Sequence, residues 1–393
     1  MNLQGVRKIL VIKLRHIGDV LLAVPVFRAL REHFPDGHIS ALVNSGTEDV
    51  LRGNPLINEI LPFDRNVKGL SPVKRYLKEI GFLKQVRARG VDMTVDLTGG
   101  DRAAVLSFVS GARYRLGWRP KKGFPGKRRL YTHLSRPEAG KHMVLQNLDV
   151  VSQFGIDTGD LSVNFHIPEN DRALVRAMLR ERRITEGEPI VHIHPTSRWL
   201  FKCWKDEYMA EVIGWLVNQG LKVAITSSTD PKEINKAKLI LSLVSDFTSP
   251  HIPVSARGGI AGLLDLCGKT TIKQLAAVSE RSVLFFGVDS APMHIAAAVG
   301  SPVVALFGPS GAFHWGPWDN RSSLSGVQSS AFESPYRQRS GIQTFGIHTV
   351  VQRDWGCIPC GSDGCEGTKI SKCLDDISPD EVMDVLRKKL VKP

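Results

Sequence analysis

The sequence predicts an α/β protein with two domains, each built around a parallel sheet. Its 393 residues, 42% of them hydrophobic, are enough to bury two cores. Short apolar strands alternate with helical segments in both halves, which is typical of parallel sheets covered by helices. Residues 285–308 (FFGVDSAPMHIAAAVGSPVVALFG) show the pattern most clearly, because a strand, a small-residue helix and a second strand there predict a parallel βαβ unit.

The first half of the chain supplies the first alternation. We expect strands at residues 8–14, 38–43, 57–62 and 93–97, and helices at residues 19–33, 47–53, 74–89 and 143–154. The basic segment at residues 113–129 (RYRLGWRPKKGFPGKRR) interrupts this alternation with eight Lys or Arg side chains and no acidic one. Because glycine and proline are interspersed there, we expect a loop rather than a helix.

The second half begins a new alternation with a strand at residues 189–194. We expect a further strand at 222–226 and helices at 206–219, 232–244 and 272–278, ahead of the βαβ unit. The junction between the halves lies within residues 155–188. We set the domain limits at residues 1–170 and 171–376, followed by a C-terminal segment at 377–393.

The charge balance restricts the partners of this chain. A net charge of +13 favours nucleic acid, a membrane surface or phosphorylated substrates. No recognised nucleic-acid module accompanies the basic segment, so we expect no nucleic-acid partner. No apolar run is long enough to span a bilayer, and the first residues lack the features of a signal peptide. Together with the few cysteines, these features predict a cytoplasmic protein.

Asp19 is the first candidate for chemistry. Gly18-Asp19 follows the first predicted strand, where open parallel sheets bind ligands. A carboxylate at this place could remove a proton from an attacking hydroxyl. An aspartate in a first helical turn also stabilises the helix dipole and caps free N–H groups, so both roles remain open from local sequence.

Two further candidate groups follow strands of the second half. Thr196 and Ser197 could bind phosphate oxygens through hydroxyl and N–H groups, and Lys202 adds a positive charge. A helix cap and a solvated lysine are the alternatives.

The other group surrounds the helix start at Ala291, which suits a phosphate. Asp289 and Ser290 precede this helix, and Asp289 could accept hydrogen bonds from a sugar hydroxyl. His294 could donate a hydrogen bond to a phosphate, or it could be a core histidine.

The segment CIPCGSDGCEGTKISKC places four cysteines close together: Cys357, Cys360, Cys365 and Cys373. The first pair has the spacing of metal ligands, but the other separations are shorter than in the usual zinc modules. A structural zinc site, a pair of disulfides and simple packing of a loop remain open.

Three blocks in order along the chain, KLRHIGDVLLAVPV, HIHPTSRWLFKCW and GVDSAPMHIAAAVGSPVVALFGPS, resemble the ADP-heptose:lipopolysaccharide heptosyltransferases of glycosyltransferase family 9. The first block is most similar to the heptosyltransferase III branch. The resemblance implies a GT-B fold, with two Rossmann-like domains facing across a cleft. It implies an acceptor site on the N-terminal domain, a donor site on the C-terminal domain, and a last helix at about 379–390 that crosses back to the N-terminal domain.

The resemblance also implies an activity: inverting transfer of L-glycero-D-manno-heptose from ADP-heptose to the inner core of lipopolysaccharide, with no metal or other cofactor required. The expected partners are the nucleotide sugar, the anionic core acceptor and, peripherally, the inner face of the inner membrane. A family member that uses another nucleotide sugar, and a non-catalytic protein that binds a nucleotide sugar or glycolipid, are the alternatives.

Individual roles follow from the same resemblance. Asp19 matches the base and Lys202 a catalytic contact to the departing phosphate, and the residues beside Asp19 are assigned to the acceptor. The matching donor contacts are Thr196, Ser197, Lys202, Asp289, Ser290, Ala291 and His294, and the acceptor contacts are Arg15, His16 and Gly18. Residues 227–230 depart from the glycine-rich turn that is frequent in relatives, so no ribose contact is assigned. Residues 319–353 do not align.

Overall fold

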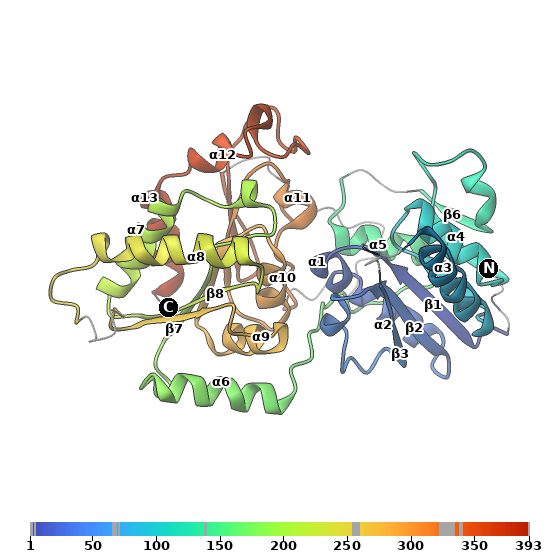
Figure 1. Cartoon of the computed structure of the whole chain (residues 1–393), viewed down its shortest axis with the longest axis horizontal. Helices are drawn as coiled ribbons and strands as arrows, with labels where there is room; N and C mark the ends of the chain where they lie inside the picture. Colours follow the sequence, from blue (N-terminus) through green and yellow to red (C-terminus); the bar gives the residue numbers. More distant parts are fainter. Residues whose placement is uncertain are drawn as a thin grey trace. The chain divides into compact units, whose positions relative to one another are not determined.

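The computed structural model of the chain describes residues 3, 5–64, 69, 71–136, 140–253, 260–321, 335–337 and 341–391. The chain divides after His166 into two compact units, where the sequence placed the limit of the first domain at residue 170 (Figure 1). Each unit has its own sheet and its own core. Among the described residues, no helix has both the length and the apolar character that crossing a bilayer requires.

The N-terminal unit is a parallel sheet with helices on both faces. Its described strands lie in the order β3-β2-β1-β4-β5-β6, and every pair is parallel. The strands are β1 Lys8–Lys13, β2 His38–Asn44, β3 Glu59–Phe63, β4 Met93–Asp96, β5 Tyr114–Trp118 and β6 His133–Ser135. The helical segments are α1 Ile17–Leu21, α2 Val24–His33, η1 Glu48–Val50, α3 Pro72–Ala88, α4 Asp101–Val109, η2 Lys127–Leu130 and α5 Met143–Ser152.

Helices α3 and α4 cover one face of this sheet. Val86 of α3 and Leu106 of α4 pack with Leu10, Ile12 and other buried strand residues in one apolar cluster. Helices α2 and α5 contact each other and the sheet. Because both faces are covered, the central strands β1, β2 and β4 are buried along nearly their whole length, as expected for a parallel sheet.

Several sequence predictions for this unit were wrong in part, and the helix expected at residues 47–53 is only the 3-10 turn η1. The helix expected at residues 19–33 is split into α1 and α2, with Leu22 and Ala23 between them. Pro25 lies in the first turn of α2, where its missing N–H is tolerated, whereas a continuous helix would need that N–H.

The basic segment at 113–129 is also not entirely loop. Its first part is strand β5, in which Tyr114 and Leu116 are buried while Arg115 between them is only half-buried. This alternation is the pattern of a strand, but the density of basic residues hides it in the sequence.

The C-terminal unit repeats the architecture with one antiparallel edge strand. Its described strands lie in the order β12-β13-β11-β10-β7-β8-β9, and β12 runs antiparallel to β13. The strands are β7 Ile190–His194, β8 Lys222–Ser227, β9 Leu263–Cys267, β10 Leu284–Val288, β11 Val303–Phe307, β12 Gly341–Phe345 and β13 His348–Gln352. The helical segments are α6 Glu169–Glu181, η3 Leu200–Lys202, α7 Asp206–Asn218, α8 Pro231–Leu243, η4 Val244–Phe247, α9 Ile272–Arg281, α10 Ala291–Ala298, α11 Ala312–Trp315, η6 Cys365–Gly367, α12 Lys372–Asp375 and α13 Pro379–Leu390.

The core of this unit has two layers. Phe286 of β10 belongs to the cluster formed with α7, α8 and α13, whereas its neighbour Phe285 belongs to the cluster formed with α10 and α11. Helix α13 packs on α7 and buries Val382, Val385 and Leu386 in the first cluster. The crossing of this helix back to the N-terminal domain stays a prediction. Residues 322–334 and 338–340, part of the segment that does not align, lie outside the described residues.

Candidate active site

Both sheets reverse their strand order at one point, and parallel sheets bind ligands at the carboxyl ends of the strands there. In the N-terminal unit the reversal lies between β1 and β4, and in the C-terminal unit between β7 and β10. Asp19 follows β1, whereas Thr196 and Ser197 follow β7 and Asp289 follows β10. Each group of predicted site residues therefore lies at the switch point of its own sheet.

Asp19 is a half-buried residue in the short helix α1. Its carboxylate forms no hydrogen bond or ion pair with the residues that the structure describes. The N-cap position of α1 belongs to His16, without a capping bond from the side chain. A carboxylate that has no hydrogen-bond partner within the described residues is available to a substrate hydroxyl.

A buried network supports the Asp19 segment from within the N-terminal unit. Lys13, the last residue of β1, donates from Nζ to the carbonyl of Leu97 (3.0 Å) and to Oδ1 of Asn147 (2.9 Å). Asn147 donates from Nδ2 to the carbonyl of Leu22 (3.1 Å), at the end of α1. Burial lowers the pKa of Lys13 to about 8, while the negative charge of Asp19 acts in the opposite direction. Lys13 and Asp19 are therefore electrostatically coupled.

Asp96, the last residue of β4, shapes the other side of this switch point. Its Oδ1 accepts from the N–H groups of Thr98 (2.7 Å) and Gly99 (3.1 Å), and its Oδ2 accepts from the hydroxyl of Tyr131 (2.5 Å). Burial raises the pKa of Asp96, against the effect of these hydrogen bonds. This carboxyl group fixes a turn and is fully buried.

The residues assigned to the acceptor lie beside Asp19 but differ in exposure. Arg15 and His16 are exposed, whereas Gly18 is buried. Arg15 donates from Nη2 to the carbonyl of Thr98 (3.0 Å), so its guanidinium group lies at the loop that follows β4. Their role in acceptor binding stays a prediction.

The basic segment leaves the sheet at the same edge, because it follows the carboxyl end of β5. Lys127 is buried and anchors it through the carboxylate of Asp101 (2.9 Å) and the carbonyl of Gly99 (2.8 Å). Five other cations of the segment, all after strand β5, are exposed: Arg119, Lys121, Lys122, Arg128 and Arg129. The N-terminal unit thus has exposed positive charge at the edge that holds Asp19.

At the C-terminal switch point, two of the predicted residues contact each other directly. Nζ of Lys202 lies 2.6 Å from Oδ2 of Asp289, and the hydroxyl of Ser310 donates to the same oxygen. The Lys202 side chain is 23% exposed and that of Asp289 only 7%, so the cation is the accessible partner. The Lys202 segment is held in place by Trp204, whose Nε1 donates to the carbonyl of Ile377 (3.1 Å).

Thr196 is fully buried, and its hydroxyl is already occupied. It donates to Oε2 of Glu233 (2.8 Å), and Ser228 donates to Oε1 of the same carboxylate (2.7 Å). His194 lies behind Thr196, and burial lowers its pKa to about 3, so this imidazole is neutral. The hydroxyl of Thr196 was expected on a donor phosphate; in this structure it orders the loop. A phosphate contact from Thr196 stays a prediction.

The other donor residues surround the start of α10. Ser290 is the N-cap, but its side chain forms no capping bond. Its Oγ is buried and has no hydrogen-bond partner among the described residues, as is typical of a group that awaits a ligand. Ala291 is the first residue of α10, and His294 is buried one turn further on. Ser197 is buried, and its Oγ accepts from the N–H of Trp199 (3.4 Å).

The sequence analysis missed residues that the fold brings to these sites. Ser310 could have been found, since it closely follows strand β11. Glu233, Lys13 and Asn147 gave no local signal, because their partners lie far away in the sequence. Asp230, in the turn that departs from relatives, accepts from the N–H of Lys232 (2.8 Å) and caps α8.

The four C-terminal cysteines form no disulfide in this structure, and a structural zinc site there stays a prediction. Every cysteine of the chain, each in a described stretch, is a free thiol. Throughout the described ranges, no three His, Cys, Asp or Glu side chains are grouped so that they could hold a metal ion. Cys373 is buried and Cys357 and Cys360 are exposed, which fits the packing of a loop.

The fold defines the class of protein first. A glycosyltransferase family 9 structure from Veillonella parvula matches with a TM-score of 0.73 and 22% identity, covering 100% of this chain and 99% of that one. Escherichia coli heptosyltransferase WaaC, solved with ADP, matches with a TM-score of 0.66 and 18% identity, covering 97% and 99%. These likenesses confirm the predicted α/β GT-B fold with two Rossmann-like units.

The sequence then gives the family. The profile described as glycosyltransferase family 9 (heptosyltransferase) matches residues 80–340. Lipopolysaccharide heptosyltransferase 3 of Escherichia coli is 31% identical over 311 residues, which cover 78% of this chain and 85% of that protein. The chain therefore belongs to glycosyltransferase family 9, as its three sequence blocks predicted. The matched range contains the donor residues of the C-terminal unit, while Asp19 lies before it.

Proposed function

We propose that this chain transfers L-glycero-D-manno-heptose from ADP-heptose to a hydroxyl of the lipopolysaccharide inner core, with inversion at the anomeric carbon and without a metal ion in the chemistry. Family membership and the names of its relatives support the heptose and lipopolysaccharide assignments. WaaC has been solved with ADP and with ADP-2-deoxy-2-fluoro heptose, which supports an ADP-linked donor. The observation that carries the mechanism is the contrast between the unpaired Asp19 and the paired Lys202.

Asp19 acts as the general base. The acceptor hydroxyl attacks the anomeric carbon while Asp19 removes its proton, and ADP leaves from the opposite face. The absence of an internal partner for this carboxylate, within the described part of the chain, supports the role. The buried cation Lys13 interacts electrostatically with Asp19, so positive charge acts on this carboxylate from within the unit.

Lys202 stabilises the charge that develops on the departing diphosphate. Its contact with Asp289 holds the ammonium group at the switch point before the donor binds. The N–H groups at the start of α10 and the buried hydroxyl of Ser290 add donors at the same edge. Together these groups supply positive potential of the kind that a divalent ion supplies in other transferases.

The acceptor is anionic, and the exposed cations of the basic segment suit it. These five side chains lie at the edge of the sheet that carries Asp19. An acceptor that is rich in phosphate and carboxylate groups and embedded in a membrane would bring the enzyme to the inner face of that membrane. Because the attraction is electrostatic, salt should weaken it.

The deciding experiment offers a panel of ADP-, UDP- and GDP-linked sugars with purified core oligosaccharide and measures release of each nucleoside diphosphate. We expect ADP release from ADP-heptose that depends on the acceptor. Turnover of another nucleotide sugar alone would identify a different donor. Donor binding without any turnover would indicate a non-catalytic binding protein.

A further inference from the structure

Helix α3 carries a group of large apolar side chains that no described residue of the N-terminal unit covers. Phe82, Leu83 and Val86 pack against the sheet, as in any helix that covers one face. The first turns of the same helix instead expose three large apolar side chains: Val73 is 67% exposed, Tyr76 66% and Leu77 61%.

These three side chains form a stripe rather than a scatter. Their spacing of three and four residues places them on one side of the helix. The helical rotation from Val73 is about 180° to Phe82 and about 220° to Val86, so these two core residues lie on another side of the helix. Leu83, at about 280°, lies at the border next to Tyr76. A surface helix with one apolar face needs no explanation, but a contiguous exposed apolar stripe marks an interaction site.

Helix α3 also carries exposed positive charge, both near its start and in its second half. Lys74, Arg75 and Lys84 are exposed, and they form no ion pair with any side chain that the structure describes. An apolar stripe flanked by exposed lysine and arginine is the composition of helices that lie in the interface of an anionic membrane.

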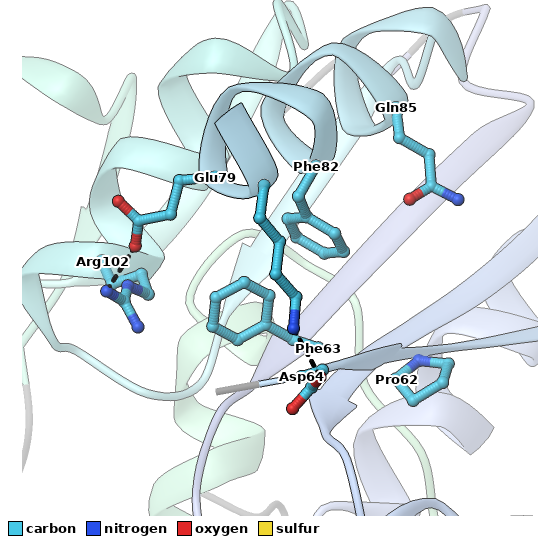
Figure 2. A pocket seen from close by; sticks show the side chains of 8 residues that line it. Pro62, Phe63, Asp64, Glu79, Phe82, Gln85 and Arg102 are labelled. Atoms are coloured by element: carbon cyan, nitrogen blue, oxygen red, sulfur yellow. Dashed lines mark hydrogen bonds and ion pairs between the residues drawn. The ribbon is translucent and has the colours of Figure 1, made fainter. Parts of the chain in front are cut away.

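Ion pairs on the inner side of the helix fix how the stripe is presented. Arg102 of α4 binds Glu79 (2.7 Å), and Lys78 binds Asp64 just after β3 (2.6 Å). Figure 2 shows these contacts around a pocket that Phe63 and Phe82 also line. The pocket side of α3 is therefore held to the unit by charge, which leaves the stripe of Val73, Tyr76 and Leu77 facing away from the core.

The stripe also lies near the edge that holds the acceptor residues. Helix α3 starts beyond the carboxyl end of β3 and packs beside α4, and α4 contacts η2 at the end of the basic segment. The apolar stripe, the exposed cations of α3 and the basic segment thus belong to neighbouring elements of one unit.

We propose that the exposed stripe of α3 docks on the surface of an anionic lipid bilayer, with Val73, Tyr76 and Leu77 inserted among the headgroups and Lys74 and Lys84 contacting the headgroup phosphates. The biological purpose rests on the proposed function, because an acceptor anchored in that bilayer would then meet the Asp19 edge. The binding itself depends only on the stripe and its charges.

The test is co-sedimentation of the full chain with vesicles of phosphatidylethanolamine containing phosphatidylglycerol, compared with vesicles lacking the anionic lipid. A variant with Val73→Gln, Tyr76→Gln and Leu77→Gln keeps good helix formers at exposed positions. We expect its partition coefficient to fall by roughly ten-fold or more, because three apolar side chains no longer insert. A matched control, Leu174→Gln with Leu239→Gln, changes exposed leucines of the C-terminal unit that are 44% and 51% exposed, and should bind as the unmodified chain does.

Two further measurements keep the outcomes distinct. Transfer of heptose to de-acylated core oligosaccharide should be equal in the α3 variant and the unmodified chain. If the unmodified chain shows no such transfer, this result would count against the proposed function alone. Vesicle binding that is equal in the α3 variant and the control would overturn the docking proposal. A concentration-dependent dimer in sedimentation velocity that the α3 variant abolishes, without vesicle binding, would overturn it in favour of a second copy of the chain.

Discussion

Each of the two sheets has one switch point, but the aspartate at one switch point has no side-chain partner among the described residues and the aspartate at the other is paired. In the N-terminal unit, Asp19 has no partner in the described chain, although the buried Lys13 acts on it through the interior. In the C-terminal unit, Asp289 is held by both Lys202 and Ser310. The carboxylate of Asp19 can therefore meet a ligand directly. The ammonium group of Lys202 is instead paired with the carboxylate of Asp289 inside the unit.

This difference matches what each edge has to do in the proposed reaction. A general base has to be ionised and accessible before the acceptor arrives. A cation that binds a diphosphate can be paired with a neighbouring carboxylate beforehand, because the diphosphate carries more negative charge and attracts the cation more strongly. The following predictions test whether the contrast is functional.

The largest effect is expected for Asp19→Asn. It removes proton acceptance while it keeps the shape of the side chain, so kcat should fall by about 10²–10⁴-fold. Donor affinity should change little, because the carboxylate does not contact the donor in this account. Steady-state kinetics and calorimetric donor titration check both values, with Asp36→Asn as a control at an exposed aspartate of the same unit.

The second effect is expected for Lys202→Met, which should weaken donor binding and lower kcat by roughly 10–100-fold each, as expected for loss of a charge-assisted contact. Lys202→Arg should recover part of this loss. Unchanged affinity for ADP in the methionine variant would remove Lys202 from the donor site.

The same two variants sharpen the comparison through stability. Lys202→Met leaves the buried carboxylate of Asp289 without its cation and should lower the free energy of unfolding by about 1–3 kcal/mol. Asp19→Asn should stay within about 0.5 kcal/mol of the unmodified chain, because no internal partner is lost. Denaturant unfolding measures both, and equal losses would erase the distinction between the two edges.

A smaller effect depends on pH. Burial lowers the pKa of Lys13 from 10.5 to about 8, so the folded protein releases this proton more readily than the unfolded chain. The buried, protonated Lys13 therefore lowers the free energy of unfolding below about pH 8. This loss of stability disappears as the pH rises from about 8 to 10.5. Activity should move the other way, because the cation that supports Asp19 is lost above about pH 8.

The pH dependence of kcat measures this effect. In Lys13→Met the decline above pH 8 should vanish, because the group that titrates there has been removed. An unchanged profile in a folded Lys13→Met variant would show that the lysine is only structural.

The smallest expected effect is that of metal removal. Dialysis against EDTA should leave heptose transfer unchanged, because Lys202 and the start of α10 stabilise the departing diphosphate in this account. Loss of transfer that magnesium restores would contradict that part of the mechanism.

Much of this arrangement could be predicted from strand ends. Apolar runs located β1, β7 and β10, and polar residues directly after them identified Asp19, Thr196 and Asp289. The resemblance to the family gave the bounds of the last helix, and the structure shows that Ser378 caps it. Local sequence could not reveal β5, where arginines alternate with buried residues, or the break between α1 and α2.

The contacts themselves could not be predicted, because they depend on the order of strands in each sheet. Lys202 meets Asp289 only because β7 and β10 are neighbours. Thr196 was correctly located after its strand, but its partner Glu233 comes from a different helix. Asn147 reaches Lys13 across 134 positions of sequence, which no spacing rule connects.

The most direct test is a crystal structure of the chain with an unreactive ADP-heptose analogue and core oligosaccharide. The account predicts a carboxylate oxygen of Asp19 about 3 Å from the acceptor hydroxyl, within hydrogen-bond reach, and Lys202 on the diphosphate of the same complex. A complex with both ligands bound, in which another group contacts that hydroxyl and Asp19 stays in solvent, would contradict it.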